Sequence, residues 1–148
     1  MDEASIRRLR DAANSLASLS YPHRVKICRE AAKDLALIFK DHSFSDNEFA
    51  KFTLFLARLG VSADQLCGEV EHRFWQDAFG TKIDPERFYK LTNGGASQSF
   101  VRKMNDLIDN LSPKAKEDSC TIVMGFICAD GVVSENEFGL LVRLFDYD

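Results

Sequence analysis

Apolar residues recur at intervals of three and four along most of this chain, which is the spacing that places them on one face of an α-helix. No stretch alternates apolar and polar residues with the period of two that a half-buried strand needs. The pattern therefore predicts an all-α fold without a β-sheet. One apolar stripe within residues 21–40 consists of Val25, Cys28, Ala32, Leu35 and Phe39.

Residues that start and stop helices divide the pattern into about seven or eight helices. Serine or aspartate, often with proline or glutamate close behind, opens most segments, and glycine closes several of them. With 148 residues, of which 45% are apolar, the chain can form one core, so we expect a single domain over residues 1–148. The predicted helices cover about 3–19, 21–40, 46–59, 63–79, 85–91, 100–111, 113–129 and 135–145.

One nine-residue segment occurs twice. Residues 41–49 and residues 130–138 share five of nine positions, and apolar positions continue in the same register through the helix that follows each segment. A duplicated helical hairpin explains the match better than chance. We therefore expect two pseudo-symmetric helix–turn–helix units, over about residues 22–59 and 112–145.

Local backbone chemistry accounts for the form of this repeat. Ser45 and Glu48 have the spacing of a capping box, and the same spacing recurs 89 positions later. A chain that reverses so quickly needs a left-handed residue just past the end of the first helix. Gly131 adopts that conformation freely, and His42, at the matching position, is one of the side chains enriched there. The turn is thus explained without a ligand.

The carboxylates of the repeat leave two alternatives open. Asp41 and Asp130 sit at the negative C-terminal end of a helix, so either the first amides of the next helix or a cation should compensate them. The second copy matches only the latter half of an EF-hand loop, because the earlier ligand positions are apolar, and we reject an EF-hand. A composite cation site would need Asp41, Glu48, Asp130 and Glu137 to converge. Capping accounts for the same residues and is the interpretation that the residues favour.

The segment Ala-Asp-Gly-Val-Val-Ser-Glu-Asn-Glu at 129–137 lies between two apolar helices and resembles the repeated signature of the TerB-like family. That family is named for bacterial tellurite resistance and also occurs as a domain of the DjlA co-chaperones. The resemblance covers about residues 35–59 and 124–145. It implies an all-helical domain with two such units, and a non-catalytic role in tellurite resistance, stress response or a membrane-associated complex.

The same resemblance implies that a divalent cation, Ca²⁺ or Mg²⁺, binds at the acidic turns. His42 stands where the family has glycine, so the second copy is the better candidate. No His-Pro-Asp triplet occurs, so the chain has no J domain. The metal-binding positions implied by the resemblance are Asp41, Asp46, Glu48, Asp130, Glu135 and Glu137.

Charge and composition narrow the classes of partner. The 19 basic and 23 acidic residues are mixed along the chain and give a net charge of −4, which disfavours binding to nucleic acid. The longest apolar run, residues 121–128, is too short to cross a bilayer, and the first residues lack the features of a secretory signal. We therefore expect a cytoplasmic protein without a transmembrane segment. Four cysteines without zinc-site spacing are expected to be reduced core residues: Cys28, Cys67, Cys120 and Cys128.

The remaining constellations are weak signals for chemistry. Glu69 and His72 have the Glu-x-x-His spacing of di-iron bundles, but no second pair exists, so we interpret His72 as a surface or partner residue. The sequence has no nucleophile elbow, phosphate-binding loop or motif-supported Cys–His pair, so we expect no enzymatic activity. An aromatic-rich region is interpreted as core rather than as a groove for a partner. It contains Phe74, Trp75, Phe79, Phe88 and Tyr89.

Two functions from different classes follow from these observations. The first is the non-catalytic, cation-binding protein that the TerB-like resemblance implies. The alternative is a metal-independent protein–protein interaction module, an adaptor in a stress or membrane-associated complex. Dependence of partner binding on a divalent cation separates the two.

Overall fold

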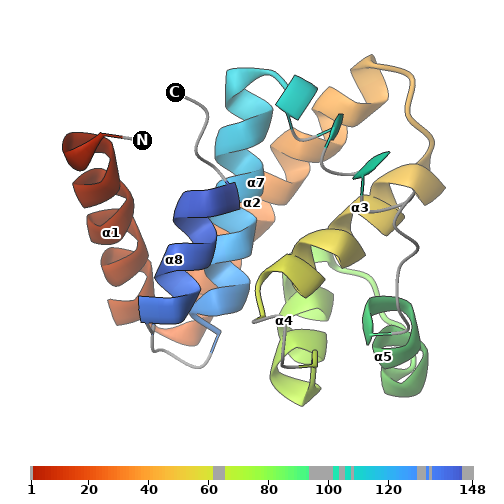
Figure 1. Ribbon diagram of the computed structural model, residues 1–148. Helices are drawn as coiled ribbons and strands as arrows, with labels where there is room; N and C mark the ends of the chain where they lie inside the picture. The colour runs from red at the N-terminus through yellow and green to blue at the C-terminus, as the bar shows by residue number, and fades with distance from the viewer. Residues whose placement is uncertain are drawn as a thin grey trace.

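A computed structural model of the chain describes residues 2–61, 66–93, 102–103, 106–107, 109–129, 133 and 135–144. Within these ranges every regular element is an α-helix and no residue lies in a strand, so the all-α prediction is confirmed (Figure 1). No described helix is both long enough and apolar enough to traverse a bilayer. The helices are α1 Glu3–Ser18, α2 Tyr21–Asp41, α3 Asp46–Leu59, α4 Glu69–Phe79, α5 Pro85–Asn93, α7 Pro113–Ile127 and α8 Glu135–Leu144, and the described residues of 102–110 are helical too.

The centre of the fold is the contact between α2 and α7, which is the most extensive between any two described helices. Helices α4 and α3 pack against this pair on one side, and α1 and α8 lie side by side on the other (Figure 1). The two central helices approach closely because Gly125 has no side chain. A Cβ atom at this position would lie 2.4 Å from Cys28 Sγ and 2.7 Å from Phe74 Cζ.

Aromatic rings fill the space between α2, α3 and α4. The ring of Phe39 is fully buried, and its centroid lies 5.0 Å from that of Phe44, 5.2 Å from Phe49 and 4.9 Å from Phe52. Such tilted and edge-on pairs add to the stabilisation from burial. The core interpretation of the aromatic-rich region is confirmed for Phe74, Trp75 and Phe88, which are buried, and Phe79 and Tyr89 are partly buried against the same core.

Most helix boundaries agree with the capping signals, and the start of α4 is the main correction. The predicted start after Ser62 falls within residues 62–65, outside the described residues, but α4 begins only at Glu69. The backbone of Cys67 is held out of the helix by the Asn93 side chain, whose amide accepts from its N–H at 2.8 Å and donates to its carbonyl at 2.9 Å. Glu71 then accepts from the Gly68 N–H at 3.0 Å and starts the helix there.

Candidate functional site

The turn between α2 and α3 is closed by a capping box, as predicted. The Glu48 N–H donates to Ser45 Oγ at 3.1 Å, and the Ser45 N–H donates to Glu48 Oε1 at 3.1 Å. The backbone hydrogen bond from Ser45 lowers the pKa of the Glu48 carboxyl below its usual range. Glu48 is therefore an ionised residue with a structural role at this turn.

The left-handed residue of this turn is Ser43, not His42. His42 has φ −94° and ψ 17° and still donates its N–H to carbonyls of α2, whereas Ser43 has φ 65°. Ser43 and Phe44 then donate to the carbonyls of Lys40 and Phe39 at 3.0 Å each, which completes the helix end. The sequence predicted the left-handed conformation for His42, one residue too early. That prediction assumed that the first residue after the helix adopts it.

Asp41 and Asp46 are exposed on either side of this turn. Asp41 is the last residue of α2 and Asp46 the first of α3. Among the hydrogen bonds of the described residues, the Glu48 amide at the N-terminus of α3 donates to Ser45 Oγ, and no α3 amide donates to Asp41. Three of the six implied metal-binding positions, these two and the capping Glu48, thus belong to one turn, and all three residues are exposed.

In the second copy of the repeat, Glu135 is engaged by α1. The Arg10 guanidinium donates to both Glu135 carboxylate oxygens, at 2.7 Å and 3.3 Å, and its central carbon lies 4.1 Å from the centroid of the Phe138 ring. This ion pair lowers the pKa of the Glu135 carboxyl. Asp130 and the side chain of Glu137 lie outside the described residues, so their positions stay predictions.

The described acidic residues do not gather into one site. Among the described residues, no three His, Cys, Asp or Glu side chains lie close enough together to hold a metal ion. Glu48 is used within its own helix cap and Glu135 binds Arg10, and these are separate turns. Convergence of the two turns on one cation therefore stays a prediction.

The two turns also differ where their first helices end. α2 extends to Asp41, but α7 ends at Ile127, before the matching Asp130 is reached. The second helices start in the same register, because α3 begins at Asp46 and α8 begins at Glu135, 89 positions later. The repeat is therefore retained at the start of the second helix and altered at the end of the first.

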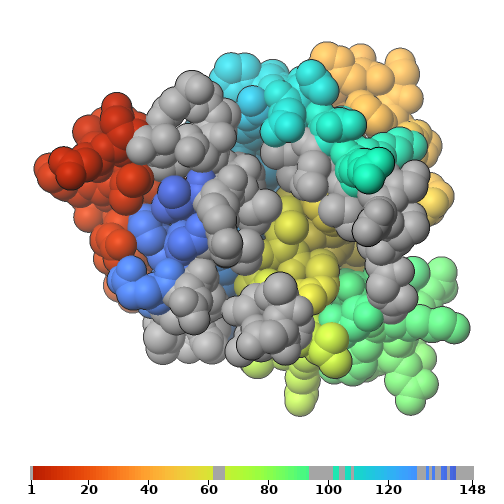
Figure 2. Space-filling model, viewed as in Figure 1, coloured from red at the N-terminus to blue at the C-terminus, as the bar shows by residue number. Residues whose placement is uncertain are grey.

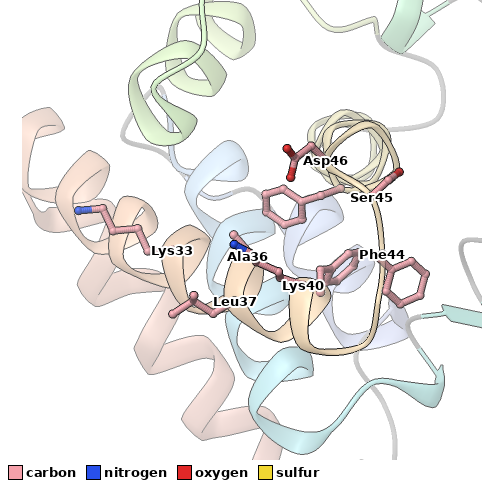
Figure 3. A pocket seen from close by; sticks show the side chains of 9 residues that line it. Lys33, Ala36, Leu37, Lys40, Phe44, Ser45 and Asp46 are labelled. Atoms are coloured by element: carbon pink, nitrogen blue, oxygen red, sulfur yellow. The ribbon is translucent and has the colours of Figure 1, made fainter.

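An open groove runs along α2 beside the first turn of α3. It has a volume of about 410 Å³ and is formed by the outer side of α2 and the residues that enter α3. Figure 3 shows the α2 side chains Lys33, Leu37 and Lys40 along one wall and Asp46 at the start of α3 on the other. The complete lining is Lys33, Ala36, Leu37, Phe39, Lys40, Phe44, Ser45, Asp46 and Phe49.

Leu37 is the most exposed of the apolar residues that line this groove. Its side chain is 61% exposed although it lies in the middle of a long helix. The exposed apolar residue stands between Lys33 and Lys40, four residues after one and three before the other, so all three share one face of α2. Our sequence analysis missed this groove. The available signal was a leucine outside the buried stripe of the second helix.

A second cavity of about 370 Å³ lies on the other side of the same turn. Phe39 and Phe44 line both cavities and separate them. Here the walls contain charges of both signs, with Glu48 and Lys51 on α3 and Lys103 and Asp106 opposite. None of the residues that line this cavity is an exposed large apolar side chain like Leu37, and we consider the first groove the better binding site.

The other residues singled out for chemistry are structural. All four cysteines are free and buried, as predicted, and burial raises the pKa of Cys28 to about 12 and that of Cys67 to about 11. Such thiols are protonated near neutral pH and are poor nucleophiles. His72 is buried, which corrects the surface interpretation, because its Nε2 lies 2.9 Å from the Ile83 carbonyl and its ring packs on Phe88.

Comparison with known protein families, curated proteins and solved structures finds no match to this chain.

Replacing Glu135 by glutamine is expected to destabilise the fold at neutral pH and to have little effect in acid. The ion pair lowers the pKa of Glu135 in the folded state. Its contribution to the free energy of unfolding is therefore complete above the ordinary glutamate pKa and is lost as the pH falls through the folded-state pKa. Urea denaturation of both proteins between neutral pH and about pH 3 measures the difference. If the difference in free energy of unfolding between the two proteins stays constant or grows on acidification, the stabilising role of the Arg10–Glu135 ion pair is contradicted.

Proposed function

We propose that this chain is a non-catalytic helical module that binds a helical segment of a partner protein in the groove between α2 and α3. The exposed Leu37 in a groove that three phenylalanines also line is the observation on which the proposal rests. Contiguous exposed apolar surface with a polar rim is typical of interaction sites. An amphipathic helix places its apolar face into such a groove and leaves its charged flanks in water.

The shape and charge of the groove support a helix as the ligand. The apolar floor is bordered by two lysines on the α2 side and by Asp46 on the α3 side. A partner helix can bury leucine-like residues at the floor while its two flanks meet charges of opposite sign. The described thiols are buried, Glu48 caps α3 and Glu135 pairs with Arg10, and these structural roles support binding rather than catalysis.

The TerB-like resemblance fits within this proposal. We propose that the chain is a cytoplasmic protein with two related helical hairpins, which acts as an adaptor in stress or tellurite tolerance. The retained register of α3 and α8 supports the relation between the hairpins. The groove would then be the surface through which one hairpin meets a partner.

Selection from a library of helical peptides tests the proposed function. We expect binders whose affinity falls about tenfold for Leu37→Ser, which removes one buried leucine contact. Leu91→Ser is the matched control, because Leu91 is also exposed, at 54%, and does not line the groove. Binding should persist in chelator. Binders that are equally sensitive to both substitutions, or none at all, would exclude the groove as the binding surface.

A divalent cation at the α2–α3 turn is the second candidate. The exposed carboxylates of Asp41 and Asp46 on either side of one turn favour it, since Ca²⁺ and Mg²⁺ prefer oxygen ligands. Calorimetric titration with Ca²⁺ and with Mg²⁺ should give saturable heat that is lost in the Asp41→Asn, Asp46→Asn variant. Absence of heat from the intact protein would leave the helix-binding function as the sole proposal.

A further inference from the structure

One described helix already packs on a hairpin that the repeat relates to the one beside the groove. Helix α1 lies across the hairpin of α7 and α8, and Figure 2 shows the two terminal helices side by side on the surface. Arg10 binds the Glu135 carboxylate with two hydrogen bonds and covers the Phe138 ring. One turn further along α1, the Ala13 carbonyl accepts from Cys128 Sγ at 3.6 Å. The intramolecular contact thus consists of an arginine, a small residue three positions later and an acidic, aromatic hairpin surface.

The internal repeat places the same hairpin surface at the open groove. The hairpin residues that contact α1 are Cys128, Glu135 and Phe138. The residues 89 positions earlier are Phe39, Asp46 and Phe49. All three line the groove between α2 and α3. Asp46 and Glu135 are each the first residue of their helix, so the acidic group has the same place relative to the aromatic ring one turn later. On the α3 side, the first hairpin therefore presents an acidic and an aromatic residue in the places of the two that hold Arg10 in the second.

The α2 wall of the groove has no equivalent in the contact with α1, because its counterparts on α7 are buried against α2 and α4. Lys33 and Lys40 stand where the second hairpin has Ile122 and Ala129. Both lysines are exposed, and they lie two helical turns apart on one side of the groove. A ligand that resembles α1 on the Asp46 side should therefore differ from α1 on the opposite side, where carboxylates would complement the two ammonium groups.

We infer that the groove binds an amphipathic partner helix that has an arginine with a small residue three positions later on one flank and carboxylates on the other. The arginine donates to Asp46 and stacks on Phe49, as Arg10 does on Glu135 and Phe138. The small residue lets the helix lie close to α2, and Leu37 becomes buried against it. This inference rests on the proposed helix-binding function and specifies the chemistry of its partner.

A synthetic peptide with the sequence of residues 2–19 of this chain, with glutamates placed on the flank that faces Lys33 and Lys40 and both ends blocked, tests the inference on the full-length protein. It should bind saturably, and Asp46→Asn should weaken its binding about tenfold, as expected for loss of a charge-assisted, bidentate arginine contact. An Arg10→Ala peptide should bind about tenfold more weakly, and the two changes together should cost little more than either alone. Glu135→Gln is the matched control and should leave peptide binding unchanged.

Three results would overturn the inference. The first is absence of saturable binding, or binding insensitive to Asp46→Asn. The second is binding that responds to Glu135→Gln instead, because the peptide would then have exchanged with α1 at its own site. The third is concentration-dependent dimerisation that Asp46→Asn abolishes, which would place α1 of a second copy in the groove. If library peptides bind the groove while the peptide derived from α1 does not, the inferred sequence features of the partner helix are wrong, but the proposed helix-binding function is retained.

Discussion

Gly125→Ala is expected to lower the free energy of unfolding by about 2 kcal/mol, because the added methyl group has no room between α2, α4 and α7. The new Cβ would lie 2.4 Å from Cys28 Sγ and 2.7 Å from Phe74 Cζ, both fully buried. Alanine is intrinsically better than glycine in a helix by about 1 kcal/mol, so a net loss requires the overlap to outweigh that gain. Urea denaturation followed by circular dichroism measures the change.

The matched control for this substitution is Gly139→Ala in α8. A Cβ atom at Gly139 meets no heavy atom within 4 Å. The helix propensity of alanine is then unopposed, and we expect a gain of up to about 1 kcal/mol. Opposite signs for the same chemical change would identify packing as the cause. A Gly125→Ala protein as stable as the wild type would show that Cys28 and Phe74 can move aside.

Phe39→Ala is expected to have the largest effect of any single substitution considered, a loss of about 4 kcal/mol. The ring is 2% exposed and contacts three other phenylalanines that join α2 to the turn and to α3. Its removal leaves a cavity in the core and also deletes the floor of the groove. The variant should therefore unfold at lower urea concentration, as followed by circular dichroism and by the fluorescence of Trp75, the single tryptophan.

Leu37→Ala on the same helix is the control for Phe39→Ala. Because Leu37 is 61% exposed, its truncation should change stability by less than about 0.5 kcal/mol. The pair separates a residue that holds α2 in place from one that is available to a ligand. A loss below about 2 kcal/mol for Phe39→Ala would mean that the neighbouring rings close the cavity.

Local sequence signals predicted the helices well because their causes are local. The capping boxes and prolines act within a few residues, so Ser45 and the Ser112–Pro113 pair start their helices where expected. The delayed start of α4 could not be predicted in this way, since Asn93, 26 residues further along the chain, provides the hydrogen bonds that hold Cys67 outside the helix. The burial of His72 depends in the same way on the distant Ile83 and Phe88.

The candidate site was predicted only in part for a similar reason. The repeat correctly indicated the capping roles of Ser45 and Glu48. It did not reveal that Arg10, 125 residues earlier in the chain, binds Glu135, because a basic residue in the first helix gives no local sign of its partner. The groove could not be predicted from the sequence either, since it depends on the relative placement of α2 and α3. A leucine on the polar face of α2 was the one local indication of a binding surface.

The docking of α1 on α8 has a consequence for the order of events during synthesis. Arg10 and Ala13 leave the ribosome long before Phe138 and Cys128, the residues against which they come to rest. At a translation rate of about 5–20 residues per second, the first helix waits for several seconds without the surface that covers its apolar side. The fold is therefore closed last at this contact, when α7 and α8 bring the surface on which the first helix rests.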